Sequence, residues 1–524
     1  MLTLRIERDP RADLPGAPAA HARLVDALRA ARPFGHPVLR VETLETHIST
    51  VLLAGEFAYK LKKPVDLGFV DFTTLEKRRQ CCEDEVRLNR RTAPQLYLGV
   101  VPIVGSVDRP VLAGGGEPIE YAVKMRRFAP NATFDALPIL PHQIDALAAL
   151  VAAFHRSVSV AAPGSDFGTP AQIRMTALDN FRQSRMRVED RAGVEALARL
   201  EAWTQREFER LTPTFEERLR RGFVRECHGD LHLGNVALID GRPVPFDCIE
   251  FSAPLRWIDV INEVAFTVMD LMAHGDRNLA LRFLNAYLEE TGDYEGVAVL
   301  RFYLVYRAMV RAKVAAIQRR RQSFERYLRL AEELSARRSD PGLVITCGLS
   351  GSGKTTFARA LAGSLGAVHI RSDVERKRMH GIHAGARAQT AIGTGIYTLQ
   401  ATAATYERLT RLARSVLLGG FPVIVDATFL RRSERQTFRD LARRIGARFV
   451  IARCEAPLPA LRARLLAREG EHDASDATPA VLERQLTNRE GFMPAEAEAA
   501  VTCDTLDRRK VAQALVDVEN RLAA

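Results

Sequence analysis

The sequence contains no long apolar run and no signal-peptide pattern. A helix needs roughly 20 consecutive apolar residues to span a bilayer, and no stretch of the chain approaches that length. The N-terminal run MLTLRIERDPRADLPG carries charges where a signal peptide has an uninterrupted apolar stretch. These absences exclude a membrane-spanning class and predict a cytoplasmic protein without a membrane partner.

Cysteine is scarce and follows no pattern. The seven cysteines are scattered, odd in number and without a C-x-x-C spacing. This distribution is typical of free thiols in a reducing compartment. Neither a disulfide framework nor a zinc site is therefore indicated.

Lysine is also rare, because arginine supplies most of the basic residues. Lys plus Arg (75) exceeds Asp plus Glu (64) by 11, and such an excess can indicate an anionic partner such as nucleic acid. The excess is spread over many Arg-bearing helices without interleaved aromatic residues, so nucleic acid remains a possible but less favoured partner. The oligomeric state has no signal in the sequence. The lysines that merit individual inspection are Lys60, Lys62, Lys63, Lys124 and Lys354.

The chain is too long for one hydrophobic core and divides by pattern. Residues 1–37 form an extension with a helix, and residues 38–127 show short β-like runs with one helical stretch. Helical periodicity dominates residues 128–338, so 38–338 predict a bilobal α+β domain with the outline of a protein-kinase-like fold. The polar segment SARRSDPG predicts a linker at 339–342. Strands and helices alternate over 343–524, which predicts an α/β domain with a parallel sheet.

A phosphate-binding loop begins the second domain. The motif GLSGSGKT follows the apolar run LVITC and precedes the helix TTFARALAGSL, which is the context this loop requires. Glycines let backbone N–H groups turn toward phosphate, Lys354 reaches the β- and γ-phosphates, and the Thr355 hydroxyl is a Mg²⁺ ligand. The predicted ATP-binding residues here are Gly348, Ser350, Gly351, Ser352, Gly353, Lys354, Thr355 and Thr356.

Further candidates in this domain are two carboxylates and a group of arginines. Asp426 ends the apolar run VIVD and is predicted to hold Mg²⁺ through water, although a strand-end helix cap is an alternative. Asp373 follows the run AVHI and is predicted to orient an acceptor hydroxyl at the carboxyl edge of the sheet, either instead of or as well as capping a helix. Arg464 and Arg468, with Arg462 nearby, could close over the phosphates or simply form a solvated helix face.

These motifs (GLSGSGKTT, RSD, VIVDATF and the arginines) resemble the small P-loop kinases. That group includes gluconate kinases, chloramphenicol phosphotransferase, zeta toxins and the kinase domain of polynucleotide kinase. The resemblance implies that Asp373 contacts the acceptor hydroxyl. It does not choose among acceptors.

A second constellation lies in the first domain, in CHGDLHLGNV followed by PFDCIEF. Between Asn235 and Asp247 the pattern NVALI, DGRP, VPFD predicts a hairpin with its turn at Asp240-Gly241. If the turn is centred on Gly241, Asn235 and Asp247 face each other across two strands. An amide oxygen and a carboxylate then converge on one Mg²⁺, and Asp230 is left to take the acceptor proton. This is the division of roles found in kinases.

A lysine upstream is expected to contact the nucleotide phosphates. Lys60 on a β run is the first choice, with Glu85 on the following helix as its partner. Lys62 on the same strand face and Glu83 on the helix remain open alternatives. Three more residues are of lower priority: His228 and His232 are interpreted as packing or supporting residues, and Glu250 as either a metal-assisting or a surface residue.

The residues His228, Gly229, Asp230, Asn235 and Asp247 resemble the H-G-D-x-x-x-x-N and following Asp of the aminoglycoside phosphotransferase family. The chain departs from that family at ETHISTVLLAGEF, which lacks the glycine-rich hairpin expected over the phosphates. The whole chain resembles bacterial two-part proteins that join such a domain to a P-loop kinase-like domain and are described as ATP-binding or AAA-family ATPases.

The leading hypothesis is an enzyme with two Mg²⁺-ATP sites that moves the γ-phosphate to hydroxyls of small molecules. The predicted cofactors are ATP and Mg²⁺. One alternative is a 5′-hydroxyl polynucleotide kinase, favoured by the second domain and the net charge. Another is an ATP-hydrolysing regulatory switch with an inert first domain.

Overall fold

The computed structural model describes residues 17–67, 70–188, 190–336, 342–384, 386, 395–467 and 475–523. Contacts divide the chain into two compact units. The first unit extends to His274 and also includes Phe302–Ser335, whereas the second consists of Gly275–Arg301 and the chain from Ala336 onward.

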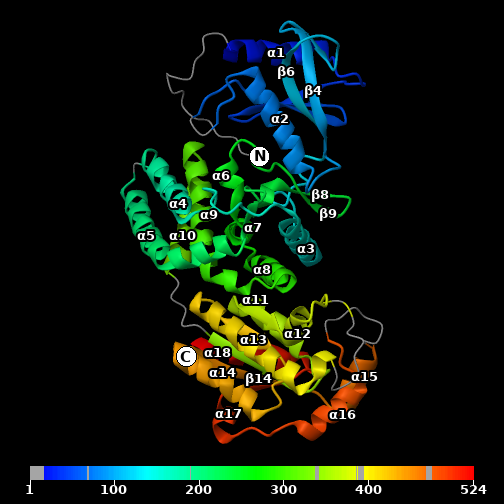
Figure 1. The fold of residues 1–524 in the computed structure, drawn as a ribbon, viewed down its shortest axis with the longest axis vertical. Helices are drawn as coiled ribbons and strands as arrows, with labels where there is room; N and C mark the ends of the chain where they lie inside the picture. The colour runs from blue at the N-terminus through cyan, green and yellow to red at the C-terminus, as the bar shows by residue number, and fades with distance from the viewer. Residues whose placement is uncertain are drawn as a thin grey trace. The chain divides into compact units, whose positions relative to one another are not determined.

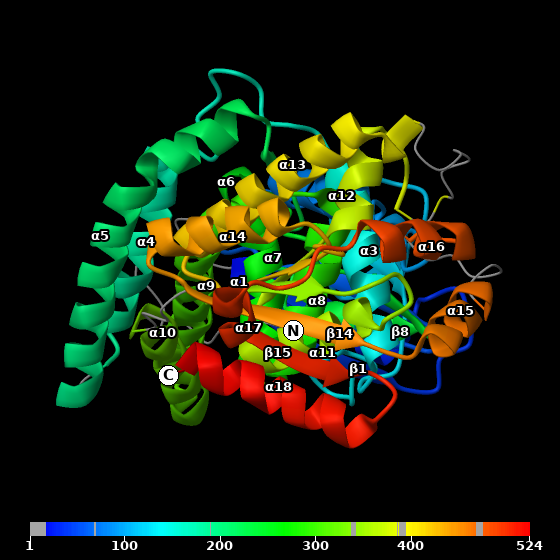
Figure 2. The ribbon, with the colours of Figure 1, turned by 90° about the horizontal axis from the view of Figure 1, so that it is seen from below.

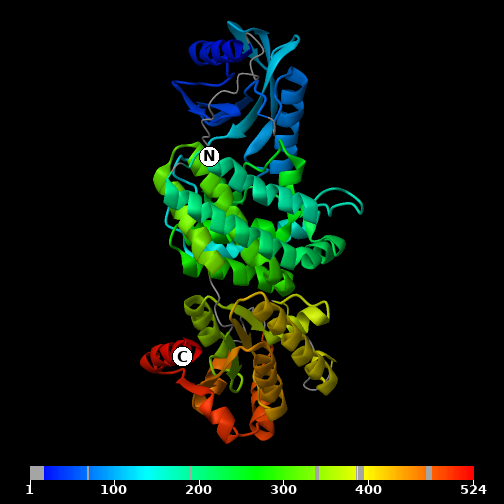
Figure 3. The same cartoon turned by 90° about the vertical axis from the view of Figure 1, so that its left-hand side faces the viewer.

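An antiparallel sheet forms the β-rich part of the first unit, in the order β1-β2-β3-β6-β4-β5. Side chains alternate between its faces, so that Leu52 and Tyr59 pack with α1 whereas Val51 and Ala58 pack with α2. Figures 1 and 3 show the two helices on opposite sides of the sheet. The elements are α1 (Ala17–Ala31), β1 (Val41–Glu45), β2 (Ser49–Ala54), β3 (Phe57–Lys62), α2 (Leu75–Asn89), β4 (Tyr97–Ser106), β5 (Arg109–Leu112) and β6 (Pro118–Arg126).

Helices form the rest of the first unit (Figure 1). They are α3 (Pro141–Ser157), α4 (Pro170–Arg185), α5 (Arg191–Arg220), α6 (Ala253–Arg256), α7 (Val260–Ala273), α10 (Arg321–Ala336) and most of α9 (Val297–Ile317). Between them lie a β7 (Val224–Glu226) and β10 (Trp257–Asp259) pair and the hairpin of β8 (Val236–Ile239) and β9 (Arg242–Pro245). The predicted turn is confirmed, because Asp240 and Gly241 have φ of +50° and +75°, as a two-residue hairpin turn requires.

A five-stranded parallel sheet forms the centre of the second unit, in the order β12-β13-β11-β14-β15. Its strands are β11 (Gly342–Cys347), β12 (Val368–Arg371), β13 (Val423–Asp426), β14 (Arg448–Glu455) and β15 (Ala500–Asp504). Figure 2 shows α13 and α14 side by side over this sheet. The helices are α11 (Lys354–Leu365), α12 (Ser372–Met379), α13 (Leu399–Leu418), α14 (Arg432–Ile445), α15 (Leu458–Ala467), α16 (Pro479–Asn488), α17 (Pro494–Glu498) and α18 (Arg508–Ala523). The predicted fold class is thus confirmed for both domains.

One helix of the second unit comes from the part of the sequence assigned to the first domain. The predicted domain 38–338 includes α8 (Arg277–Thr291), yet α8 packs beside edge strand β12. The amide of Asn285 donates to the carbonyl of Ala367 at 3.0 Å and accepts from the amide of His369 at 2.8 Å. Arg371 adds an ion pair with Glu289 at 2.8 Å. The physical reason is that an open sheet edge needs partners for its backbone groups.

The predicted extension, lobe limits and linker otherwise stay predictions. Among the helices that the structure describes, none combines the length and apolar character needed to cross a bilayer.

Candidate active sites

A buried charge network lies at the centre of the first unit. The Lys60 ammonium is 2.8 Å from a Glu85 carboxylate oxygen and 2.6 Å from an Asp247 oxygen. Lys62, on the same strand face, is 2.5 Å from the other Glu85 oxygen and also contacts Glu250. Glu83 instead pairs with Arg79 at the surface. The structure therefore places Glu85 between both lysines, while Lys60 alone reaches Asp247.

The network holds its groups in their charged forms. Burial alone would lower the pKa of Lys60, but the Asp247 and Glu85 carboxylates raise it above its ordinary value. Burial alone would raise the pKa of Glu85, but Lys60 and Lys62 lower it. These lysines and carboxylates therefore stay ionised inside the fold, because each of them contacts a group of opposite charge.

Asp230 and Asn235 meet at the end of the catalytic-type loop. The Asn235 amide donates to the Asp230 carbonyl at 2.9 Å and to its carboxylate at 3.0 Å, and His232 lies 3.5 Å from the same carboxylate. Burial opposes ionisation of Asp230, yet the nearby His232 and Arg311 lower its pKa. Asp230 is accordingly a carboxylate at neutral pH.

The hairpin register differs by one residue from the prediction. The turn is centred between Asp240 and Gly241, so Asn235 faces Phe246, whose amide donates to the Asn235 carbonyl at 2.9 Å. Asp247 comes one residue later, with φ of +63°, a strained conformation for a non-glycine residue. Its amide donates to the Tyr97 hydroxyl at 3.1 Å. The position of Asp247 is therefore not set by the pairing of β8 with β9.

The oxygen donors of this site fit Mg²⁺. The Asn235 side-chain oxygen accepts no hydrogen bond from the residues that the structure describes, because only its amide nitrogen is engaged. One Asp247 oxygen contacts Lys60 and the other has no hydrogen-bond donor among those residues. Amide and carboxylate oxygens are the ligands that this hard cation prefers.

Several residues that sequence reasoning missed brace the loop. The Glu263 carboxylate accepts from the amides of His228 at 3.0 Å and Gly229 at 2.6 Å, and contacts His155 at 3.0 Å. Arg307 of α9 donates to the Gly229 carbonyl at 3.1 Å. The signal was present in VINEVAFTVMDLM, where buried polar residues interrupt an apolar helix. His228, predicted as a supporting residue, donates from its Nε2 to the Phe246 carbonyl at 2.9 Å.

Lys60, Asp230 and Asp247 line a cleft of about 840 Å³. One part is apolar and is formed by Val51, Leu53, Ala58, Met125 and Phe246, next to Lys60. The other part lies between α4 and α9 beyond Asp230. The cleft therefore has room for both a nucleotide and an acceptor.

In the second unit, the phosphate-binding loop connects β11 to α11. Gly348, Gly351 and Gly353 all have positive φ, and a Cβ at Gly348 would lie 2.4 Å from the Cys454 carbonyl oxygen, so a side chain is excluded there. The Lys354 ammonium donates to the Leu349 carbonyl at 2.8 Å, and burial lowers its pKa. The Ser352 hydroxyl is buried without a partner among the described residues, which fits a loop shaped for phosphate oxygens.

Gln485 of α16 holds this loop and was not expected from the sequence. Its carbonyl oxygen accepts from the Ser350 amide at 2.8 Å, and its amide donates to the Ser350 hydroxyl at 2.9 Å. The helix carrying Gln485 lies 135 residues from the loop in sequence, and no local pattern marked it.

Three parallel strands bring the other candidates to the same sheet edge. β13, next to β11, ends at Asp426, and β12, next to β13, leads into Asp373. Asp426 is 3.2 Å from the Thr346 hydroxyl and 3.4 Å from His369. Burial opposes ionisation, but His369, Thr355 and Lys354 lower the pKa of Asp426 to about 2. The Asp426 carboxylate, next to Thr355, fits a Mg²⁺ site. Asp373 is half-buried.

The arginines of α15 have separate positions. Arg464 donates to the Gly351 carbonyl at 3.1 Å and to the Thr505 hydroxyl at 3.0 Å, so it contacts the loop backbone. Arg462 pairs with Glu483 at the surface. Arg468 lies outside the described residues. Thr356 is exposed on α11.

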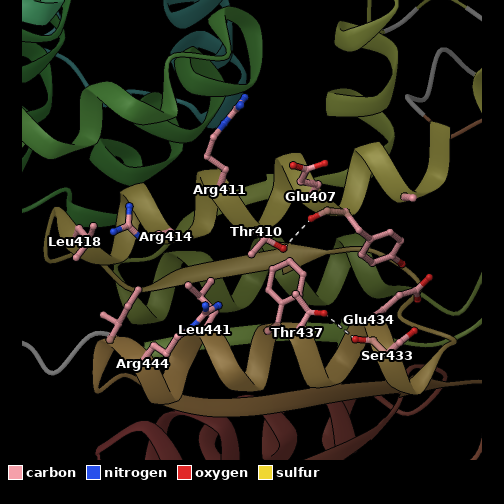
Figure 4. Close-up of a pocket in the computed structure, with 14 residues that line it drawn as sticks. Glu407, Thr410, Arg411, Arg414, Leu418, Ser433, Glu434, Thr437, Leu441 and Arg444 are labelled. Atoms are coloured by element: carbon pink, nitrogen blue, oxygen red, sulfur yellow. Dashed lines mark hydrogen bonds between the residues drawn. The ribbon is translucent and has the colours of Figure 1, made fainter. Parts of the chain in front are cut away.

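A groove of about 910 Å³ in this unit lies between α13 and α14. Figure 4 shows Thr410, Thr437 and Leu441 within it and Arg411, Arg414 and Arg444 around it. None of its 14 lining residues is a predicted site residue.

Comparisons with known proteins match each of the two domains to a family. A family described as "Phosphotransferase enzyme family" matches residues 79–300, and one described as "AAA domain" matches residues 343–492. The chain is 31% identical over 456 residues to the uncharacterized protein Rv2004c of Mycobacterium tuberculosis and equally to Mb2027c of Mycobacterium bovis. The alignment covers 84% of this chain and 89% of each relative.

The chain is also similar to two solved structures. A gluconokinase from Sinorhizobium meliloti is 25% identical, covering 36% of this chain and 94% of its own, with a TM-score of 0.25. The GDP and kanamycin complex of APH(2")-IIia is 14% identical, covering 60% of this chain and 99% of its own, with a TM-score of 0.38.

Both matching families are consistent with an ATP-binding phosphotransferase. The match to the mycobacterial proteins extends through both domains. The chain therefore belongs to the family of these mycobacterial proteins, and in it a phosphotransferase domain is joined to a P-loop kinase domain.

Proposed function

We propose that this phosphotransferase has two Mg²⁺-ATP sites and transfers the γ-phosphate of ATP to hydroxyl groups of small molecules at each. The observation that carries the proposal is the first cleft. There Lys60, paired with Glu85, reaches Asp247, and the Asp230 carboxylate lines the same 840 Å³ space. A cation for phosphate, oxygens for a metal and an ionised base are thus supplied by one cleft.

Each residue of the first site has a distinct part. Lys60 holds phosphate oxygens, and Asn235 and Asp247 would hold Mg²⁺, which when bound neutralises phosphate charge. Asp230 accepts a hydrogen bond from the acceptor hydroxyl and orients its oxygen toward the γ-phosphorus. Since its pKa lies below the ordinary value, Asp230 acts mainly by orientation until the proton leaves the acceptor oxygen.

A compact turn replaces the missing glycine-rich loop. Thr46 to Ser49 join β1 to β2, and the Ser49 amide donates to the Thr46 hydroxyl at 2.8 Å, while Lys63 holds the Thr46 carbonyl at 2.6 Å. The Ser49 hydroxyl and the His47 Nε2 are buried in the cleft wall without partners among the described residues. Polar groups in this state support phosphate binding by the turn.

The second site uses the P-loop. Lys354 and the loop amides hold phosphate, and Thr355 and Asp426 would hold Mg²⁺. Asp373, in the first turn of α12 directly after β12, faces the acceptor. Arg464 fixes the loop through Gly351 rather than standing free above it.

The test is transfer of ³²P from γ-labelled ATP into a bacterial metabolite extract by the full-length protein and by Lys354→Ala and Asp230→Asn variants. We expect two labelled products, each lost in one variant. Release of free phosphate alone, dependent only on Lys354, would instead identify an ATP-hydrolysing switch. Label entering only added 5′-hydroxyl oligonucleotides would favour a polynucleotide kinase.

A further inference from the structure

One face of α9 lines the acceptor half of the first cleft. Tyr306, Val310, Lys313 and Ile317 follow one another at spacings of four, three and four residues, which puts them on one side of the helix. All four line the cleft, together with Asp179 and other residues of α4 opposite. This face of α9 therefore presents apolar side chains with the Lys313 ammonium among them.

Lys313 has no close protein partner among the residues that the structure describes. The structure gives its ammonium neither a hydrogen bond nor an ion pair with any described residue, although the side chain is half-buried. Burial lowers the pKa of Lys313, and the Asp179 carboxylate opposes this only in part. Asp179 itself pairs with Arg182 and accepts from Gln183 on its own helix. Ammonium groups in such surroundings are normally paired, and here Asp179 offsets the charge of Lys313 only in part.

The position of Lys313 relative to the catalytic loop is set by Arg307. Arg307 binds the carbonyl of Gly229, the residue before Asp230. Lys313 lies six residues farther along α9, which corresponds to about 9 Å of helix axis. Tyr306, the residue before Arg307, lines the same wall, and its hydroxyl makes no hydrogen bond to a described residue. Donors thus extend from the base into the acceptor half.

We propose that the acceptor of the first site carries an anionic group, a carboxylate, phosphate or sulfate, bound by Lys313 while its hydroxyl lies at Asp230. This inference rests on the proposed function. In the reaction, the acceptor oxygen forms a bond to the γ-phosphorus as the bond from that phosphorus to the β–γ bridging oxygen breaks. ADP leaves with the electron pair, and the acceptor proton passes to Asp230.

The charge of Lys313 also argues against the opposite class of acceptor. A cationic acceptor would add a like charge next to an ammonium whose charge Asp179 offsets only in part, which is unfavourable in a partly desolvated cleft. An anion instead supplies a charge-assisted hydrogen bond. The first cleft therefore favours an acceptor that has a hydroxyl at one end and a negative charge several bonds away.

The experiment uses full-length protein carrying Lys354→Ala, so that the second site is silent. A bacterial metabolite extract is separated on an anion exchanger into retained and unretained fractions, and each is incubated with γ-³²P-ATP. We expect label to enter a compound of the retained fraction. Adding Lys313→Met should lower the initial rate at which this compound is phosphorylated, at limiting acceptor concentration, by about tenfold or more. Lys313→Arg in its place should keep most of the original rate.

The matched control is Lys77→Met, an equal change at an exposed lysine outside the cleft, and it should leave the rate as it is. Label found only in unretained compounds overturns the inference. It is also overturned if the Lys313→Met variant phosphorylates a retained compound as fast as the protein that carries Lys354→Ala alone. Absence of Asp230-dependent label from both fractions overturns the proposed function of the first site instead.

Discussion

Glu263 of α7 is the residue whose replacement tests most directly how the first site is built. It is fully buried, and its carboxylate accepts from the amides of His228 and Gly229, the two residues before Asp230. In Glu263→Gln, the new amide group places a donor against backbone donors and removes the charge. We expect a less stable first unit and a displaced catalytic loop.

The magnitude follows from the ionisation of Glu263. Although burial would raise it, the contacts with His155 and the loop amides lower the pKa of Glu263 from 4.5 to about 2. At about 1.4 kcal/mol for each tenfold change in this equilibrium, the carboxylate stabilises the fold by about 3 kcal/mol at neutral pH. Because the folded-state pKa is the lower one, this stabilisation is complete above about pH 5 and is lost as the pH falls toward 2.

Tryptophan fluorescence during urea unfolding measures this change in the full-length protein. Both tryptophans, Trp203 and Trp257, lie in the first unit, so the signal reports on that unit alone. With a slope of about 3 kcal/mol per M urea, a loss of about 3 kcal/mol lowers the midpoint by about 1 M. The gap between wild type and variant should narrow as the pH is lowered from 5 toward 3.

Catalysis supplies the second readout, and Glu83→Gln supplies the control. Transfer that depends on Asp230 should fall by about tenfold or more, since the loop amides lose their acceptor, while transfer that depends on Lys354 should persist. Glu83 is exposed and pairs only with Arg79, so its replacement should change stability by less than about 0.5 kcal/mol. An unchanged midpoint at pH 7 for Glu263→Gln would refute this account of the loop.

Two further predictions concern the second unit. Asp373→Asn should abolish Lys354-dependent transfer without weakening ATP binding measured by calorimetry, because we propose that Asp373 orients the acceptor. A parallel loss of binding would contradict that role. Gln485→Ala should weaken ATP binding by about fivefold, because two hydrogen bonds to Ser350 are removed. The control is Gln513→Ala, at an exposed position of α18, which should leave ATP binding unchanged. Equal affinities of the Gln485→Ala variant and the wild type would show that the loop needs no support from α16.

The alternatives left open by the sequence were decided by packing. Glu83 and Glu85 are two residues apart on α2, and only the rotation of that helix against the sheet turns Glu85 inward. Lys60 and Lys62 share a strand face, so the pattern could not separate them. In the structure Lys60 forms an ion pair with Asp247, whereas Lys62 forms one with Glu250. The displacement of Asp247 from the expected register likewise reflects a left-handed residue that no turn signal announces.

Local motifs by themselves determined the P-loop, the loop from His228 to Asn235, the hairpin turn and the change from antiparallel to parallel architecture. In each, the chemistry depends on backbone conformations within a few residues, which composition and spacing encode directly. Tertiary structure alone decided that α8 covers β12, that Gln485 supports Ser350 and that Glu263 holds the catalytic loop. Those contacts join segments tens of residues apart, and they form only because buried polar groups must find partners wherever the fold brings them.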